Sequence, residues 1–204
     1  ILHHAGTHAV KAGFAGVDVF FVISGFLIGG IVLAERAAGR FSYRVFYARR
    51  ARRILPALLL VILVSLAVGW VVMTPDQLRY FGAAALTALL FVPNIWFYNR
   101  IDYFNPAAAE DPLIHTWSLG IEEQFYLVLP VLLLLTWRLG PRVRAGVLAG
   151  LMLASLGLAV VLSASHPQQA FYLIHTRAWE LLAGVLMAVI LPRTKQAGAG
   201  LAAG

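Results

Sequence analysis

The feature that most constrains this chain is the segment from Ile54 to Met73, which is apolar almost throughout and carries no charge. A helix of about 20 apolar residues has the length that crosses the hydrocarbon core of a bilayer. Similar stretches recur along the chain, and 61% of its 204 residues are hydrophobic while only 12% are charged. Soluble domains carry about 25% charged residues. The sequence therefore predicts an all-α fold, a polytopic transmembrane helical bundle surrounded by lipid.

We expect about six to seven spans or partial spans in what reads as a fragment. They cover residues 1–7, 14–34, 54–73, 81–98, 119–137, 145–165 and 178–191. The fourth is only just long enough, and Pro93-Asn94 near its middle makes a re-entrant path an alternative. No internal repeat or soluble segment is visible, so residues 1–204 are assigned to one membrane domain, truncated at both ends. The first residue is Ile1 rather than Met.

Basic residues predict the orientation. Seven of the sixteen Lys and Arg residues lie in the loop 35–53, and short basic loops stay on the cytoplasmic side of a membrane. This crowding in one loop also argues against a nucleic-acid partner, despite a sequence pI of about 10.2. Simple alternation of spans would place loop 99–116 inside and the arginines of 138–144 outside. The charge rule favours the reverse, which requires residues 81–98 not to cross fully.

Several kinds of chemistry are excluded by what the sequence lacks. There is no cysteine, so no disulfide, thiolate nucleophile or zinc-thiolate site can form. His4 and His8 are four residues apart but belong to no H-E-x-x-H motif, and we expect no metal site. The G-x-S-x-G elbow of serine hydrolases and the glycine-rich phosphate loops are also missing.

Ionisable residues within the spans are the candidate site, because charges inside a bilayer are costly and usually functional. His4 has an imidazole suited to removing a proton from a hydroxyl at neutral pH, although a packing role between helices competes. Glu122 and Glu123 lie about 100° apart around a helix, so one is expected to face the core and the other a different partner. A role as charges at a helix N-terminus competes for one of them.

The arginine cluster is the second candidate. Guanidinium groups match phosphate oxygens, but membrane anchoring or binding to anionic lipid explains the same cluster. Its members are Arg49, Arg50, Arg52 and Arg53.

Further polar residues line or support the expected site. Arg177 and Glu180 are three residues apart and read best as a structural salt bridge. Ser24 reads as part of a helix-packing seam with Gly25 and Gly29. The remaining support residues are Asp18, His115, Trp117 and Ser118, of which Trp117 also fits an interfacial aromatic belt.

At these residues the chain resembles the acyltransferase-3 family of bacterial integral membrane acyltransferases. The matching segments are His4-Ala5-Gly6 and residues 16–28, 46–56, 115–126 and 176–181. The resemblance implies the N-terminal half to two-thirds of a membrane domain of about ten helices. It implies a place in the bacterial cytoplasmic membrane and transfer of an acyl group, usually acetyl, from cytoplasmic acyl-CoA to a carbohydrate hydroxyl, with no tightly bound cofactor. It also implies that His4 is the essential histidine, and that Arg50 and Arg53 form an Arg-x-x-Arg motif for the CoA phosphates.

Together, residues and resemblance predict an O-acyltransferase in which His4 acts as the base and Glu122 or Glu123 orients its imidazole. The acyl-CoA arm would reach His4 through a polar crevice lined by Ser24, His115 and one of these glutamates. The competing hypothesis is a transporter or flippase for an anionic or lipid-linked substrate, which also uses charges within spans and broken helices. Inverted repeats would favour that hypothesis, and none is seen.

Overall fold

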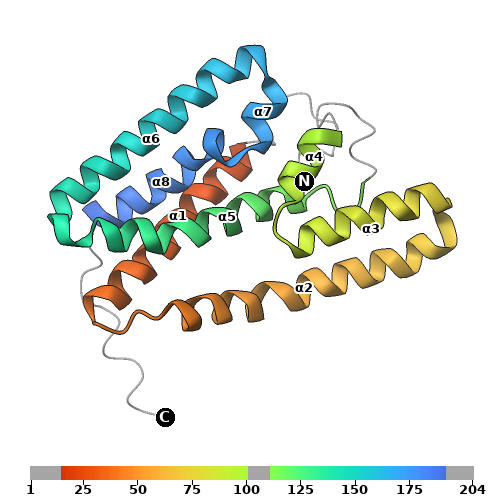
Figure 1. The fold of residues 1–204 in the computed structure, drawn as a ribbon, viewed down its shortest axis with the longest axis horizontal. Helices are drawn as coiled ribbons and strands as arrows, with labels where there is room; N and C mark the ends of the chain where they lie inside the picture. The colour runs from red at the N-terminus through yellow and green to blue at the C-terminus, as the bar shows by residue number, and fades with distance from the viewer. Residues whose placement is uncertain (1–14, 101–110, 192–204) are drawn as a thin grey trace, which may run out of the picture.

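The computed structural model describes residues 15–100 and 111–191, and within those ranges every regular element is helical. The elements are α1 (Ala15–Ala37), α2 (Tyr43–Val72), α3 (Pro75–Leu89), α4 (Pro93–Arg100), α5 (Thr116–Leu135), the 3-10 turn η2 (Trp137–Leu139), α6 (Gly140–Ser165), α7 (Pro167–Tyr172) and α8 (Ile174–Ile190). Four apolar stretches are long enough to cross a membrane, namely residues 16–37, 43–72, 116–165 and 167–190. The third contains both α5 and α6, which run in opposite directions on either side of η2 (Figure 1). The all-α membrane bundle is therefore confirmed.

Most predicted spans correspond to single helices, but residues 81–98 do not. The chain breaks between α3 and α4, and Phe91 adopts a φ of 57°. Pro93 explains the break, because it has no N–H for the helix ladder and disfavours helical geometry at the residue before it. The interpretation of 81–98 as one crossing helix is wrong, and the broken, non-crossing alternative fits. The predicted partial span at residues 1–7 lies outside the described residues.

Helix α2 begins eleven residues before the predicted span. The basic segment 35–53 is therefore mostly helical, with only residues 38–42 between α1 and α2. Alanine and arginine are good helix formers, which lets the helix continue through the arginine cluster. As a result, the four clustered arginines point in different directions around α2 instead of sharing one flexible loop.

Helices α1 and α8 lie against each other through glycines. A Cβ atom added at Gly184 would collide with the backbone of Val22 and Phe26, and one added at Gly25 would collide with the carbonyl of Leu181. A Cβ atom added at Gly29 would lie only 3.1 Å from Val185 Cγ2, closer than an ordinary van der Waals contact. Small residues at such seams let two helix backbones approach closely in a membrane. The predicted Gly25–Gly29 seam is confirmed, and Gly184 is its unpredicted counterpart.

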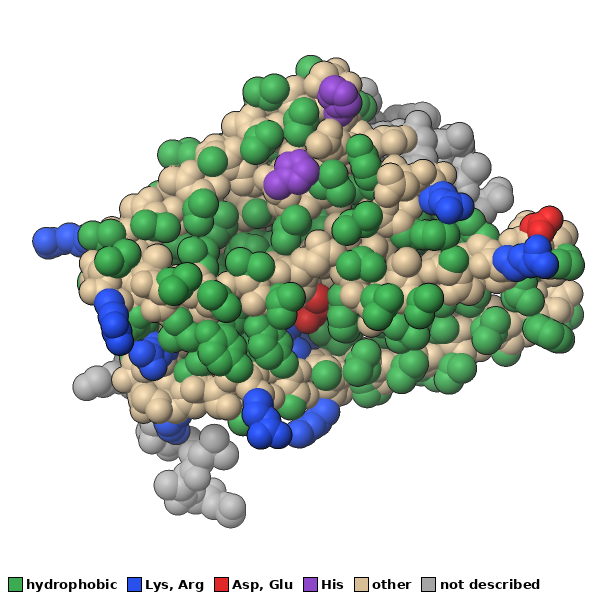
Figure 2. All heavy atoms as spheres, in the orientation of Figure 1, with side chains coloured by type: hydrophobic (Ala, Val, Ile, Leu, Met, Phe, Trp, Pro, Cys, Tyr) green, Lys and Arg blue, Asp and Glu red, His purple; other side chains and the backbone are tan. Residues whose placement is uncertain are grey.

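One end of the bundle collects the basic residues. The end of α1, the start of α2, the α5–α6 turn and the end of α8 lie together on the left of Figure 1. The Arg36 guanidinium lies 5.8 Å from the centre of the Trp137 ring, which joins α1 to that turn. Lys and Arg side chains gather there in Figure 2. We call this the basic end. Simple alternation of spans predicted that the arginines of 138–144 and the segment 35–53 lie on opposite sides of the membrane. That prediction is wrong, because α3 and α4 do not cross and both groups lie at the basic end.

We expect Gly184→Ala to lower the stability of the bundle by about 1–3 kcal/mol, because its methyl group meets backbone atoms that cannot rotate away. Thermal unfolding of the purified protein in detergent measures the effect. Gly157→Ala on α6 is the matched control, since nothing lies within 4 Å of a Cβ atom at that position. Equal unfolding temperatures for the two variants would contradict the close α1–α8 contact.

Candidate functional site

Arg50 on α2 forms a two-point ion pair with Glu123 on α5. Its Nη2 lies 2.5 Å from Oε1, and its Nε donates to Oε2 at 3.2 Å. The two side chains retain only 14% and 11% of their exposure. Paired bonds of this kind fix both distance and angle. The Arg50 guanidinium is therefore committed to Glu123 within the protein.

The ion pair continues into a chain of polar contacts that reaches α1. The Arg50 guanidinium lies 3.7 Å from the centre of the Tyr126 ring. The Tyr126 hydroxyl donates to Glu122 Oε1 at 3.0 Å, and the Ser24 hydroxyl on α1 lies beside both Glu122 and Tyr126. These five residues, which we call the polar row, connect α2, α5 and α1. Glu122 is only 6% exposed.

The order of residues along α5 explains how the polar row forms. Glu122 and Tyr126 are four apart and share one side of the helix, whereas Glu123 is turned by about 100° toward α2. The two adjacent carboxylates therefore meet different partners, as the spacing predicts. The row brings together Ser24 and Glu122, two of the residues expected to line the crevice. His115, the third, is exposed at the start of α5 and has no contact with Glu122.

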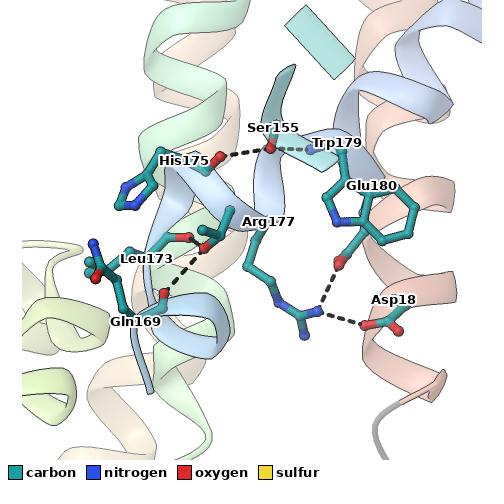
Figure 3. Close-up of polar contacts among 9 residues, drawn as sticks. Asp18, Ser155, Gln169, Leu173, His175, Arg177, Trp179 and Glu180 are labelled. Atoms are coloured by element: carbon teal, nitrogen blue, oxygen red, sulfur yellow. Dashed lines mark hydrogen bonds and ion pairs between the residues drawn. The ribbon is translucent and has the colours of Figure 1, made fainter. Parts of the chain in front are cut away.

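A second cluster lies where α8 begins (Figure 3). The Arg177 Nη1 lies 3.0 Å from Asp18 Oδ1 and 2.7 Å from Glu180 Oε1. Glu180 is fully buried. Asp18 is in the first turn of α1, so this Arg177 cluster lies at the opposite end of α1 from the basic end. The predicted Arg177–Glu180 pair is confirmed, and the contact with Asp18 is an addition that local spacing could not indicate.

Aromatic rings surround the Arg177 guanidinium. It lies between 5.4 and 5.8 Å from the centres of the Phe21, Trp117 and Phe171 rings. Trp117 is only 2% exposed, with its ring 4.4 Å from that of Phe171. Trp117 is thus a core residue beside the cluster, and its interpretation as part of an interfacial aromatic belt is wrong. Low polarity around a charge strengthens its electrostatic interactions.

Two hydroxyl groups fix the first turn of α8 and hence Arg177 (Figure 3). The Ser155 hydroxyl on α6 donates to the His175 carbonyl at 2.8 Å and accepts the Trp179 N–H at 3.1 Å. The Thr176 hydroxyl lies 2.7 Å from the Leu173 carbonyl. In lipid such bonds satisfy groups that water would otherwise solvate. Sequence analysis did not single out Ser155, because its partner lies on another helix.

Polar side chains also hold the broken α3–α4 segment. Gln124 donates to the Phe91 carbonyl at 2.9 Å and to Asn94 Oδ1 at 2.7 Å. Asn94, which is 1% exposed, donates in turn to the Tyr172 carbonyl at 3.1 Å. Backbone groups released by the break are thus bonded within the protein, as a lipid environment requires.

The connection before α5 carries its own polar group. The Asp111 carboxylate accepts the Leu113 N–H at 2.8 Å, and the Ser118 hydroxyl donates to the His115 carbonyl at 3.2 Å. Burial raises the pKa of the Asp111 carboxyl above its usual range, against the Leu113 hydrogen bond, the Tyr80 hydroxyl and the charge of His115. His115 and Ser118 therefore belong with this connection and lie away from the polar row.

The remaining arginines of the cluster differ from Arg50. Arg49 pairs with Glu35 at 2.5 Å, whereas Arg52 and Arg53 are exposed and form no ion pair within the described residues. A surface hollow of about 390 Å³ is lined by Arg44, Val45, Ala48, Arg49 and Arg52. The free positive charge of α2 is therefore on its outward side. His4 lies outside the described residues, as do His3 and His8.

Comparison with known proteins identifies similarity to acyltransferases at each level. The family described as acyltransferase domain matches residues 2–203. The peptidoglycan O-acetyltransferase OatA of Listeria monocytogenes is 35% identical over 198 residues, covering 94% of this chain and 32% of the relative. The O-acetyltransferase OatA of Staphylococcus aureus is 36% identical over 197 residues, with the same coverage. The putative peptidoglycan O-acetyltransferase YrhL of Bacillus subtilis is 35% identical over 200 residues, covering 94% and 31%.

The chain thus spans about a third of the length of these relatives. No solved structure matches it.

A double-mutant cycle tests the pair at the start of the polar row. We expect Arg50→Gln and Glu123→Gln each to cost about 3 kcal/mol in unfolding free energy, because each leaves a poorly solvated charge alone. The double variant should cost clearly less than the sum. Arg52→Gln, on an exposed side chain of the same turn, is the control and should change stability little. Additive losses would contradict the pairing.

Proposed function

We propose that this chain, which belongs to the family of acyltransferase domains, forms part of a membrane enzyme that transfers an acyl group from cytoplasmic acyl-CoA to a carbohydrate hydroxyl of the cell envelope. The acyl group is acetyl, by analogy with relatives named as O-acetyltransferases. The observation that carries the proposal is the polar row, a buried line of polar contacts that starts at Arg50 in the arginine cluster and reaches Ser24 on α1.

The polar row supports this function because a bundle that only spans the membrane does not need buried charged groups in its interior. Each charged group in lipid costs free energy, and groups of this kind mark functional paths. The row starts among the arginines, whose guanidinium groups suit CoA phosphates. It leads to Ser24, on the helix that also carries Asp18 of the Arg177 cluster. The two clusters therefore lie on the route between a cytoplasmic donor and an acceptor on the other side.

The reaction needs a base, a nucleophile and a leaving group. His4 takes the proton of the acceptor hydroxyl, the oxygen attacks the thioester carbonyl, and the C–S bond breaks to release the CoA thiolate. The protonated imidazole then returns its proton to the thiolate, so that ester and free thiol are the products. A transient acyl-histidine is the variant of this path.

The two glutamates differ in their contacts, and so do their proposed roles. Glu123 is held by Arg50 and acts as a positioning residue for the start of the row. Glu122 accepts a hydrogen bond from Tyr126, lies beside the Ser24 hydroxyl and forms no ion pair within the described residues. A carboxylate free of a cation can orient an imidazole and stabilise its protonated form. We therefore assign that role to Glu122.

The arginines divide in the same way. Arg50 already has a carboxylate partner, so exposed Arg52 and Arg53 are the better partners for the CoA phosphates. Within the Arg-x-x-Arg motif, Arg53 then contacts the donor. Arg50 holds α2 against α5 and so fixes the position of Arg53.

The first test is acyl transfer by the full-length protein in membrane vesicles. With radiolabelled acetyl-CoA supplied from the cytoplasmic side, we expect labelled acceptor from the wild type and a loss of at least a hundredfold in His4→Ala, because general base catalysis contributes about that much. His166→Ala is the control, since His166 is exposed at the end of α6. Movement of an unmodified solute without labelling would instead favour the transporter hypothesis.

The second test separates the two motif arginines. We expect Arg53→Gln to raise KM for acetyl-CoA about tenfold with kcat and thermal stability unchanged, because one charge-assisted hydrogen bond contributes about 1.5–3 kcal/mol. Arg50→Gln should lower thermal stability as well as activity. Arg79→Gln, on an exposed side chain of α3, serves as the control. An unchanged KM in Arg53→Gln would refute the phosphate role.

A further inference from the structure

A pocket of about 310 Å³ opens at the basic end between α1, α6 and α8, away from the arginine cluster of α2. Its walls are mostly apolar, and Phe26, Leu33 and Val189 are among the residues that line them. The α5–α6 turn closes one side with Trp137 and Arg144. Figure 1 shows the ends of these helices converging at the left of the bundle.

Arg144 gives this apolar pocket a single strong polar feature. It is only 7% exposed, yet its Nε and Nη1 atoms are buried with no hydrogen-bond partner in the part of the chain that the structure describes. Nor does it form an ion pair with any described carboxylate. Its guanidinium lies 4.6 Å from the centre of the Trp137 ring, and Arg36 lies 5.8 Å from the same ring. A buried charge without a partner is costly, so these donors require an anion.

The Arg144 pocket is separate from the polar row. Phe26, Gly30 and Leu33 line the pocket, whereas Ser24 faces Glu122 on α5. At about 100° per residue, Ser24 lies on roughly the opposite side of α1 from these three residues. A donor molecule that follows the polar row therefore does not pass through this pocket.

We propose that the Arg144 pocket binds an anionic phospholipid of the membrane, with its phosphodiester on Arg144 and one acyl chain along the apolar wall. Guanidinium forks match phosphate oxygens, and the start of α6 adds the positive end of a helix dipole. The lining suits an acyl chain better than the amide-rich arm of CoA, which would leave its polar groups without partners. Basic pockets between membrane helices are a recognised setting for anionic headgroups.

Native mass spectrometry of the full-length protein tests the proposal. The protein is incorporated into vesicles of equal parts dioleoyl phosphatidylglycerol and dioleoyl phosphatidylcholine and then extracted in mild detergent. We expect one retained phosphatidylglycerol in the wild type and about a tenfold smaller bound fraction in Arg144→Gln. Arg142→Gln, an exposed arginine two residues away, is the matched control and should retain the lipid. The readout is lipid retention, so it is independent of acyl transfer.

A second variant keeps the test decisive if Arg144→Gln does not fold. Ala34→Phe fills the apolar wall from an exposed position and leaves the guanidinium in place. It should also lose the phospholipid. Equal retention by wild type and Ala34→Phe would overturn the proposal, as would equal retention of both lipids.

Two competitors distinguish other sources of phosphate. Glycerol 3-phosphate carries the headgroup chemistry without an acyl chain, and coenzyme A carries the phosphates of the donor. We expect neither to displace the phospholipid at equal concentration. Displacement by glycerol 3-phosphate would show that only an anion binds, and displacement by coenzyme A would assign the pocket to the donor. Either result overturns the lipid proposal.

Discussion

A charge between apolar helices needs an opposite charge or a hydrogen bond, because lipid offers neither, and this requirement organises the bundle. Arg50 and Glu123 satisfy it between α2 and α5. Arg177 satisfies it with one carboxylate from its own helix and another from α1. Each pair fixes the rotation of two helices as well as their distance. The glycine seam between α1 and α8 then brings Asp18 close enough for its contact with Arg177.

The same requirement separates residues that the sequence presents as one group. Arg49, Arg50, Arg52 and Arg53 are near neighbours in the chain, yet one is locked to Glu123, one pairs with Glu35, and two are exposed. The helical continuation of α2 through this segment causes the separation, because each residue turns by about 100°. Membrane anchoring and phosphate binding, the two competing explanations of the cluster, both call for arginines without a protein partner, and Arg52 and Arg53 meet that condition within the described residues. Arg50 serves the structure, and the outward arginines remain available to a ligand.

Local patterns were sufficient for much of the fold. Apolar stretches predicted the long helices, Gly25 and Gly29 predicted a packing seam, and the three-residue spacing of Arg177 and Glu180 predicted their pair. Contacts between distant segments were not predictable in this way. The Arg50–Glu123 pair and the contact of Ser155 with the start of α8 depend on how helices rotate against each other. Arg144 could not be recognised either, because nothing in its neighbourhood along the chain indicates burial beside an apolar pocket.

The reversal at Phe91 determines more than the path of two short helices. Because α3 and α4 turn back without crossing, α5 starts on the far side of the bundle from the basic end and finishes within it. The end of the bundle at which each later connection lies depends on this one kink. Gln124 and Asn94, which hold the kink, thereby help to set the direction in which the later helices run. A straightened helix at this point would turn the topology of everything after it inside out.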